Sequence, residues 1–123
     1  MHKLSPSKQD YLETILDLSK QGEAVRSIDV ANTLGFSRAS VSRAISQLKA
    51  DGYILQEPYG LITLTEAGRA EAVAVRGRHD LIKNFLIRLG VGPETAEEDA
   101  CRIEHIISAE TLEKIRQRHE SEQ

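Results

Sequence analysis

The sequence predicts a mainly α-helical chain with one small β-hairpin, on three observations. Apolar residues recur with the period of a helix face over most of the chain. Two short amphipathic helices flank a tight turn within Ser27–Gly52. Two short apolar runs enclose a segment that contains Pro58 and Gly60, which are strong turn formers. Helix, turn, helix and hairpin in this order are typical of a winged helix-turn-helix domain.

Composition places the chain among globular proteins. It has 123 residues, of which 40% are hydrophobic and 28% charged, enough for one compact domain or two small lobes. No apolar run approaches the length of a membrane span and no secretory signal opens the chain, so we expect a cytoplasmic protein. The single cysteine, Cys101, agrees with a reducing compartment and leaves one thiol for chemistry.

The helix-turn-helix is expected within Ser27–Gly52. Its first helix begins near Ile28 and stops at Gly35. Ser37 is a suitable N-cap for the second helix, because its hydroxyl can accept from an early backbone N–H. The apolar residues of the second helix share one face: Val41, Ala44, Ile45 and Leu48. In such motifs the second helix enters the major groove of DNA.

The candidate DNA-contacting residues lie on the polar side of this second helix and at the tip of the hairpin. They are Ser37, Arg38, Ala39, Ser40, Ser42, Arg43, Gln47 and, at the tip, Tyr59. Arg38 and Arg43 are the best candidates for guanine or phosphate contacts. The net charge is −3, yet Phe36–Ala50 contains cations and no acid. Phosphate binding requires this kind of local positive charge.

The segments around this motif predict a first helix and a small sheet. Leu4–Lys20 is expected to be helical, with Ser5 as N-cap and a proline at the first helical position, and to end at Gln21-Gly22. We expect three strands in the sheet, at Glu23–Arg26, Tyr53–Gln56 and Leu61–Leu64. The DNA-binding domain is assigned to residues 1–72 and a helical dimerisation lobe to residues 73–123.

Three helices are expected after the hairpin. They are Thr65–Gly90 with Thr65 as N-cap, Glu94–Ile107, and Ala109–His119 capped by Ser108. The long helix is expected to carry one apolar side, made of Ala70, Val73, Ala74, Leu81, Phe85 and Leu89. A long helix that leaves a small DNA-binding lobe is typical of a connection to a dimer interface.

A candidate metal site lies on the expected helix Glu94–Ile107. Cys101, Glu104 and His105 are spaced i, i+3, i+4, which places them on one helix face. Thiolate, carboxylate and imidazole together suit first-row divalent ions. The stretch Glu94–Glu104 is strongly acidic, and His79 on the preceding helix is a further candidate ligand. From spacing alone, a half-buried cysteine beside a surface Glu-His pair is the more common interpretation of this trio, because free cysteine is among the most buried residue types.

Five collinear stretches resemble one family of regulators. They are SPSKQDYLETI, VANTLGFSRASVSRAISQLKADGYI, YGLITLTEAGR, RHDLIKNFL and EEDACRIEHIIS. Together they resemble the metal-dependent repressors of the diphtheria-toxin-repressor and manganese-transport-regulator family, over nearly the whole chain. The resemblance implies a winged helix joined to a helical dimerisation lobe, with divalent metal between the first helix and the dimerisation helices. It also implies a short form without the C-terminal SH3-like domain of many relatives.

The resemblance implies a set of six metal ligands: Asp10, Glu13, His79, Cys101, Glu104 and His105. The set is a hybrid of two patterns. Manganese-type members carry Glu where this chain has Cys101, whereas iron-type members carry Cys there but Met in place of Asp10. Lys83 replaces a Glu ligand of the iron-type ancillary site, so we expect that site to be absent in its usual form.

These features predict a homodimeric repressor that uses Mn²⁺ or Fe²⁺ as corepressor and controls metal-homeostasis genes. Zn²⁺, Co²⁺ or Ni²⁺ are expected to bind in vitro. Three other interpretations stay open: a winged-helix regulator that senses an organic effector or oxidation of Cys101, a metal-dependent hydrolase, and a structural dimer. The hydrolase interpretation is disfavoured, because no nucleophile motif or phosphate loop accompanies the ligands.

Overall fold

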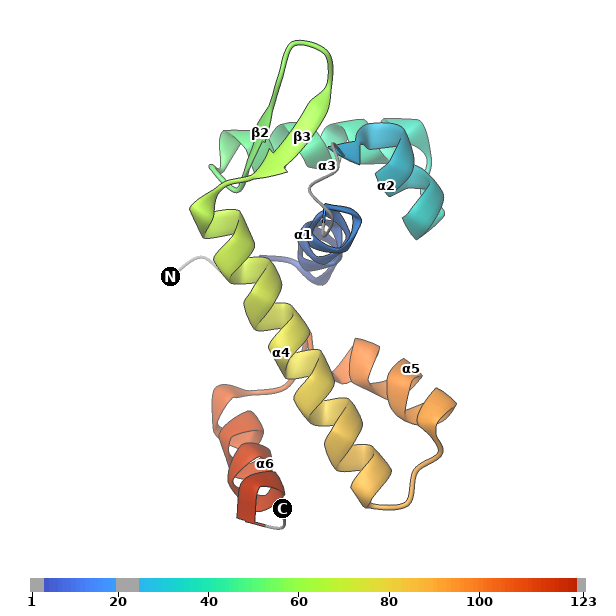
Figure 1. Cartoon of the computed structure of the whole chain (residues 1–123), viewed down its shortest axis with the longest axis vertical. Helices are drawn as coiled ribbons and strands as arrows, with labels where there is room; N and C mark the ends of the chain where they lie inside the picture. The colour runs from blue at the N-terminus through green and yellow to red at the C-terminus, as the bar shows by residue number, and fades with distance from the viewer. Residues whose placement is uncertain (1–3, 20–24, 122–123) are drawn as a thin grey trace. The chain divides into compact units, whose positions relative to one another are not determined.

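The fold was obtained as a computed structural model that describes residues 4–19 and 25–121. The chain divides into two compact units, Met1–Val73 and Ala74–Gln123, each with its own arrangement of elements (Figure 1). Within the described residues, no helix is long and apolar enough to cross a lipid bilayer.

The first unit contains the predicted helix-turn-helix. Helix α2 (Ser27–Leu34) ends at Gly35, whose φ of 73° lies in the left-handed region that glycine tolerates best. Helix α3 (Arg38–Ala50) begins after Ser37, and the backbone N–H of Ser40 donates to the Ser37 hydroxyl at 3.1 Å. Both caps that the sequence predicts are therefore confirmed.

Helix α1 (Pro6–Leu18) precedes this motif and is shorter than predicted. Its N-cap is Ser5, as predicted, and the Ser5 hydroxyl accepts from the N–H of Lys8 at 3.3 Å. Leu4 lies before the helix, while Lys20 and the expected stop at Gln21-Gly22 lie outside the described residues. The helix contributes Leu12 and Ile15, both fully buried, to the core of the first unit.

A three-stranded antiparallel sheet completes the first unit. Strands β1 (Val25–Arg26), β2 (Ile54–Gln56) and β3 (Leu61–Leu64) lie in the order β1-β3-β2. The inward-facing residues Val25, Ile54 and Ile62 are each 1% exposed. The prediction of a strand before α2 is confirmed for Val25–Arg26, whereas residues 23–24 lie outside the described part of the chain.

One predicted strand boundary is wrong. Tyr53 does not belong to β2, because its N–H donates to the carbonyl of Leu48 and closes the end of α3. Its own carbonyl accepts from the N–H of Thr65 at 3.1 Å. Tyr53 thus joins the end of α3 to the residue that caps the next helix, and the hairpin is one residue shorter than expected.

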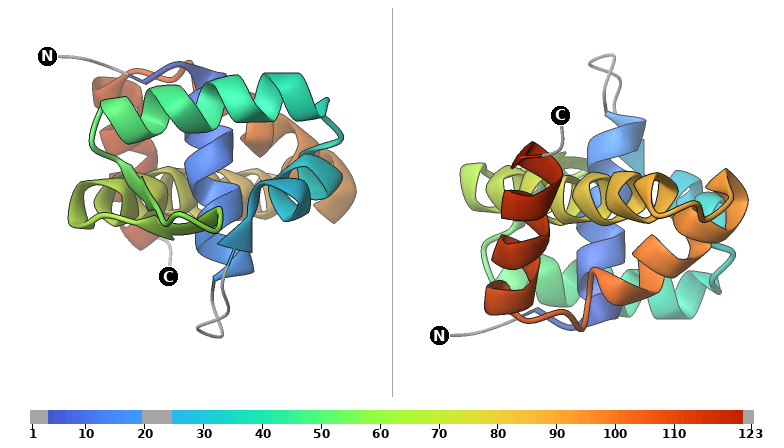
Figure 2. Two further views of the ribbon diagram at one scale, coloured as in Figure 1. Left: turned by 90° about the horizontal axis from the view of Figure 1, so that it is seen from above. Right: turned by 90° about the horizontal axis from the view of Figure 1, so that it is seen from below.

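The second unit consists of the C-terminal part of α4 (Glu66–Arg88), α5 (Pro93–Ile103) and α6 (Ala109–Ser121). Helices α5 and α6 lie on either side of α4 in Figure 1, and in the right-hand view of Figure 2 α6 crosses α4 while α5 lies beside the C-terminal part of α4. Thr65 caps α4, since its hydroxyl accepts from the N–H of Gly68, and Ser108 caps α6 through the N–H of Thr111. Both caps were predicted, although α4 ends at Arg88 and α6 extends to Ser121.

The apolar side of α4 that the sequence indicates is not the side that is buried in the structure. The residues that are buried are Ala72, Val75, His79 and Ile82, each at most 6% exposed. At about 3.6 residues per turn they lie opposite the predicted side. The predicted residues are exposed or half-buried: Ala70, Val73, Ala74, Leu81, Phe85 and Leu89. Helix α4 therefore has two apolar sides, and only one of them packs within its own subunit.

The end of α5 also differs from the prediction. The α-helix stops at Ile103 rather than Ile107, and Glu104–Ile106 form a turn. Within this turn the N–H of Ile106 donates to the carbonyl of Ile103, which tightens the chain before Ser108 starts α6. Glu104 retains helical dihedral angles, with φ −58° and ψ −24°. The predicted common face of Cys101 and Glu104 therefore survives the early end of the helix.

Candidate metal centre and nucleic-acid interface

A buried polar cluster in the second unit is built around His79. This residue lies on the buried side of α4 and is 6% exposed. Its Nδ1 atom lies 2.9 Å from Oε2 of Glu104, and its Nε2 atom lies 2.8 Å from Oε2 of Glu97. Cys101 of α5 places its sulfur 3.8 Å from the same Nδ1 atom. One imidazole is thus surrounded by two carboxylates and one thiol.

Glu104 is the most enclosed acid of this cluster. It is 3% exposed, and its Oε1 atom lies 3.4 Å from Nε2 of His105. Its backbone carbonyl accepts from Nε of Arg78 at 3.2 Å, which ties the turn after α5 to α4. A carboxylate that is buried at this depth requires positively charged or hydrogen-bonding partners. His79 and His105 supply such contacts to the Glu104 carboxylate.

The electrostatics of the cluster favour a charged imidazole when no metal is bound. Burial alone lowers the pKa of His79, but the hydrogen bond to Glu97 and the charge of Glu104 outweigh burial and raise it. The hydrogen bond from His79 lowers the pKa of Glu97, with a contribution from Lys83. A divalent ion that binds His79 must therefore displace a proton from the ring.

The donor set fits a divalent transition metal. Ligand atoms of His79, Glu97 and Cys101 all lie within 4.8 Å of one another, a spacing that one ion can span. Glu104 contacts the same imidazole, and His105 contacts the other carboxylate oxygen of Glu104. Nitrogen, oxygen and sulfur donors in one place suit Mn²⁺, Fe²⁺, Co²⁺ and Zn²⁺ more than Mg²⁺ or Ca²⁺.

Four of the six predicted ligands are brought together in the second unit: His79, Cys101, Glu104 and His105. The other two, Asp10 and Glu13, lie one turn apart on α1 in the first unit, and both are half-buried. The sequence analysis missed Glu97. Its position four residues before Cys101 puts it on the same face of α5, and this spacing is the signal that could have identified it.

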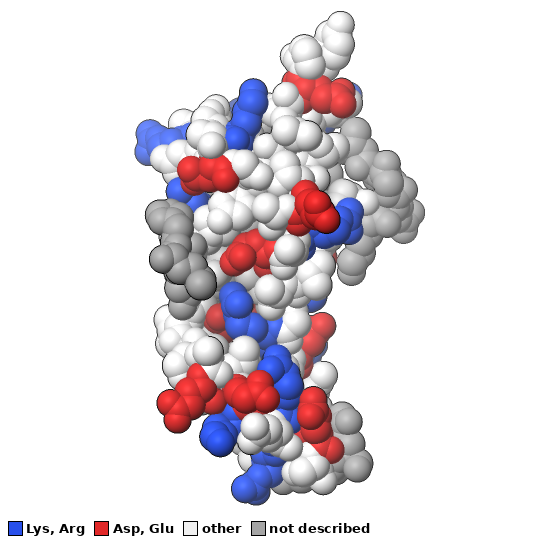
Figure 3. All heavy atoms as spheres, turned by 90° about the vertical axis from the view of Figure 1, so that its left-hand side faces the viewer, with Lys and Arg blue, Asp and Glu red and all other residues white. Residues whose placement is uncertain are grey.

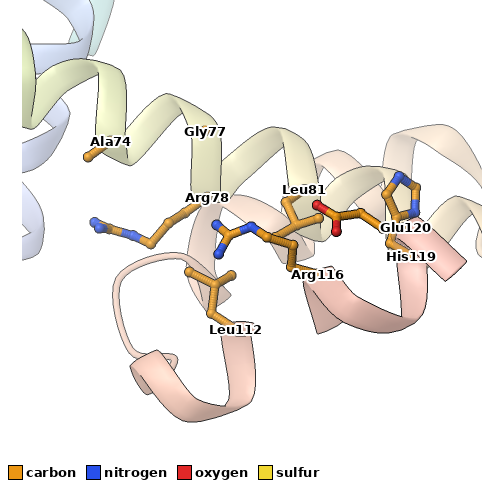
Figure 4. A pocket seen from close by; sticks show the side chains of 8 residues that line it. All are labelled: Ala74, Gly77, Arg78, Leu81, Leu112, Arg116, His119 and Glu120. Carbon is orange, nitrogen blue, oxygen red and sulfur yellow. The ribbon is translucent and has the colours of Figure 1, made fainter. Parts of the chain in front are cut away.

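A cavity of about 550 Å³ separates the centre of α4 from α6 and is distinct from the His79 cluster (Figure 4). Ala74 and Leu81 of α4 and Leu112 of α6 provide its apolar lining, and Arg116 and His119 of α6 also line it. In the described residues α6 has no buried side chain. The exposed apolar side of α4 therefore faces a groove that its own subunit does not fill.

The predicted DNA-contacting residues occupy the accessible side of the first unit. Every residue predicted at the start and on the polar side of α3 is exposed, and Tyr59 is 91% exposed at the turn between β2 and β3. Cavities of about 340 and 220 Å³ border α3. The first is lined by Ile28 and Arg38, and the second by Lys8 and Arg43, among others.

Sequence analysis missed Lys8 and Ile28 as neighbours of α3, because they belong to other helices. In the face of the molecule drawn in Figure 3, acidic and basic side chains are interspersed rather than gathered by sign. This mixture agrees with the small net charge of −3. Positive charge suited to phosphate is therefore a local property of α3 and its surroundings.

Sequence families match both units. The family described as "Iron dependent repressor, N-terminal DNA binding domain" matches residues 3–61. The family described as "Iron dependent repressor, metal binding and dimerisation domain" matches residues 65–121. The two matches therefore cover nearly the whole chain, in the order that a repressor of this family requires.

Individual relatives agree with these families. The HTH-type transcriptional regulator MJ0568 of Methanocaldococcus jannaschii is 37% identical over 92% of both chains. The transcriptional regulator MntR of Escherichia coli is 39% identical over 87% of this chain and 69% of its own length. Both relatives are described as transcriptional regulators.

Solved structures show the same fold. A manganese-dependent transcriptional repressor in complex with manganese superposes with a TM-score of 0.77 at 30% identity, over 88% of this chain and 50% of that chain. The metal-dependent transcriptional regulator MtsR superposes with a TM-score of 0.85 at 25% identity, over 95% of this chain and 55% of its own. This chain thus spans about half of those two structures. With both of its units matched in sequence and in fold, the chain belongs to the iron-dependent repressor family.

Proposed function

We propose that this protein is a transcriptional repressor that binds operator DNA as a homodimer when Mn²⁺ or Fe²⁺ is bound, and that it controls genes of metal homeostasis. The observation that carries the proposal is the His79 cluster. Four candidate ligands of three chemical types converge there, in a chain whose other unit exposes a recognition helix. The named metals follow from the donor set and from the manganese-dependent relatives.

The proposed ligands are Asp10, Glu13, His79, Cys101, Glu104 and His105. His79, Cys101, Glu104 and His105 are supported by their contacts in the second unit, whereas Asp10 and Glu13 are supported by the family resemblance. A bound dication would balance the carboxylates and fix the donor groups relative to one another. In this proposal metal binding promotes operator binding. Metal affinity and DNA affinity are then reciprocally linked.

The proposed DNA contacts are those of α3 and the hairpin tip. Arg38 and Arg43 contact guanine or phosphate, and Tyr59 contacts the backbone or the minor groove. The short polar residues at the start of α3, Ser37, Ala39, Ser40 and Ser42, together with Gln47, reach base edges or phosphates. Their exposure in the first unit supports this assignment.

The proposed dimer uses the exposed apolar side of α4 and helix α6. Leu89 is 66% exposed and Ile87 is 39% exposed near the end of α4, and the cavity beside α6 is lined by Leu81 and Leu112. A second copy that covers this surface would remove apolar area from water. The description of the matching family as a dimerisation domain supports the same assignment.

The test is anaerobic binding to DNA from upstream of the gene that encodes the protein, at fixed salt, because salt alone changes such affinities strongly. We expect Mn²⁺ or Fe²⁺ to strengthen binding at least about tenfold over chelator, a typical size for an allosteric coupling. Glu104→Ala should lower metal affinity and metal-dependent DNA binding together. Glu98→Ala, which removes an exposed acid of α5, is the control. Unchanged metal stimulation in Glu104→Ala would refute the proposal.

A further inference from the structure

Glu97 stands out because its contacts are with two groups that carry protons. Its Oε2 atom lies 2.8 Å from Nε2 of His79 and 3.2 Å from Nζ of Lys83. The same atom therefore faces an imidazole on one side and an ammonium on the other. Glu97 is also more accessible than its partner, since its side chain is 47% exposed while that of His79 is 7% exposed.

The two nitrogens of His79 face different surroundings. Nδ1 lies close to the Glu104 carboxylate and the Cys101 sulfur, which are proposed metal ligands. Nε2 lies close to Glu97. Histidines that bind metals nearly always donate their other ring N–H to a carboxylate, a carbonyl or water, and this hydrogen bond selects the tautomer and orients the ring.

We propose that Glu97 is a positioning residue of the metal centre rather than a metal ligand. It accepts the Nε2–H of His79 and thereby presents Nδ1 to the metal on the side of Glu104 and Cys101. Lys83 fixes the position of the Glu97 carboxylate, because the Lys83 ammonium pairs with Oε2 of Glu97, the oxygen that accepts from His79. This inference rests on the proposed function, in which His79 is a metal ligand.

The alternative is that Glu97 itself binds the metal, since it forms a compact group with His79 and Cys101. In that arrangement a dication would lie close to the Lys83 ammonium, and like charges at short range repel. The contact between Nε2 of His79 and Glu97 would also have to break. Both features favour Nδ1 as the metal-binding nitrogen and Glu97 as its support.

The first experiment measures metal affinity and geometry together. Mn²⁺ affinity is measured for the full chain and for Glu97→Ala, Glu97→Gln and Glu98→Ala, and the absorption spectrum of each is recorded with saturating Co²⁺. Loss of a carboxylate that hydrogen-bonds a metal ligand lowers metal affinity by about 10- to 100-fold. We expect this loss in Glu97→Ala. Glu97→Gln still accepts a hydrogen bond and should stay within about threefold of the unchanged protein.

The Co²⁺ spectrum separates positioning from ligation, because the bands depend on the number and type of ligands. We expect the same spectrum at saturation for all four proteins, with Glu98→Ala unchanged in affinity too. If Glu97→Gln loses as much affinity as Glu97→Ala and its spectrum changes, Glu97 is a ligand and the inference is wrong. It is equally wrong if Glu97→Ala binds Mn²⁺ as tightly as the unchanged protein.

The second experiment reads the tautomer of His79 directly. Long-range ¹H–¹⁵N correlation spectra of the protein loaded with diamagnetic Zn²⁺ distinguish a metal-bound ring nitrogen from a protonated one. We expect Nδ1 to be metal-bound and Nε2 protonated, and the reverse assignment would overturn the inference. Glu104→Ala separates the two proposals: if it leaves Mn²⁺ affinity unchanged, the proposed function fails, whereas failure confined to the Glu97 variants rejects only the positioning role.

Discussion

The Nδ1 atom of His79 lies 2.9 Å from Oε2 of Glu104, although the two residues are 25 positions apart in the chain. The contact joins the buried side of α4 to the turn that follows α5. Both residues are almost fully enclosed, at 6% and 3% exposure. A carboxylate and an imidazole buried together form a pair whose charge must be balanced, by a proton on the imidazole when no metal is bound and, in the proposed metal-loaded state, by a dication.

This pair predicts how the stability of the metal-free protein depends on pH. The pKa of His79 is raised in the folded state, because its carboxylate partners outweigh burial. The stabilisation is therefore complete below the unfolded-state pKa of about 6.5 and is lost as pH rises through the folded-state pKa. In chelator, the Tm of the unchanged protein should exceed that of His79→Gln most at low pH. A difference in Tm that stays constant as pH rises would contradict the prediction.

Cys101 should contribute its thiolate to the metal centre. Its sulfur lies 3.8 Å from Nδ1 of His79, on the side where the metal is proposed to bind. Cys101→Ser should weaken Zn²⁺ and Co²⁺ binding by about tenfold or more and Mn²⁺ binding less, because a hydroxyl is a harder donor than a thiolate. The Co²⁺ form of the variant should lose its sulfur-to-metal charge-transfer absorption.

The same variant tests the redox alternative. If the metal responses of Cys101→Ser match those of the unchanged protein and only a response of DNA binding to oxidant is lost, Cys101 acts as a thiol sensor and not as a ligand. Retention of the charge-transfer absorption in the variant would exclude thiolate ligation altogether. The measurements are metal titrations and DNA binding with and without peroxide.

Leu112→Glu should convert the protein to monomers. Leu112 lines the cavity between α4 and α6 and is only half-buried in its own subunit, so its replacement leaves the core intact. A carboxylate in an apolar dimer interface would be buried without a partner. We expect monomers by analytical ultracentrifugation, weaker operator binding and a helical circular dichroism spectrum like that of the unchanged protein. A stable Leu112→Glu dimer would place the interface elsewhere.

Arg43→Ala should weaken operator binding through the loss of one positive charge on α3. If Arg43 contacts a phosphate, the slope of log K against log salt should fall in magnitude by about 1, with a similar loss on all sequences. If it contacts guanine, discrimination of one base pair should fall by about 1–3 kcal/mol instead.

Gly68→Ala should destabilise the first unit. A Cβ atom at this position would collide with the backbone oxygen of Tyr53, so the start of α4 would have to move. Overpacking of this kind costs about 1–3 kcal/mol. Gly77→Ala in the same helix meets nothing within 4 Å and should be stabilising by up to about 1 kcal/mol, since alanine is the better helix former. Equal Tm values for the two variants would contradict this prediction.

The sequence by itself determined much of the local structure in both units. Ser37 and Gly35 fix the turn between α2 and α3 through contacts within a few residues, and Ser5, Thr65 and Ser108 start their helices in the same way. Such caps depend on side chains and backbone groups three residues apart. The exposure of the polar side of α3 follows from its amphipathic period, so the predicted DNA-contacting surface was accessible as well.

Only the tertiary structure decided which side of α4 is buried and which acid contacts His79. Periodicity identifies the apolar sides of a helix, but α4 has two of them. Packing within the subunit buries Val75 and Ile82 and leaves Val73 and Leu89 exposed. The contact of Glu97 with His79 spans 18 positions between two helices, a relation that no local pattern encodes. The physical reason is that helix caps and the spacing of apolar residues depend on neighbours along the chain. A buried polar cluster depends on the way separate helices pack.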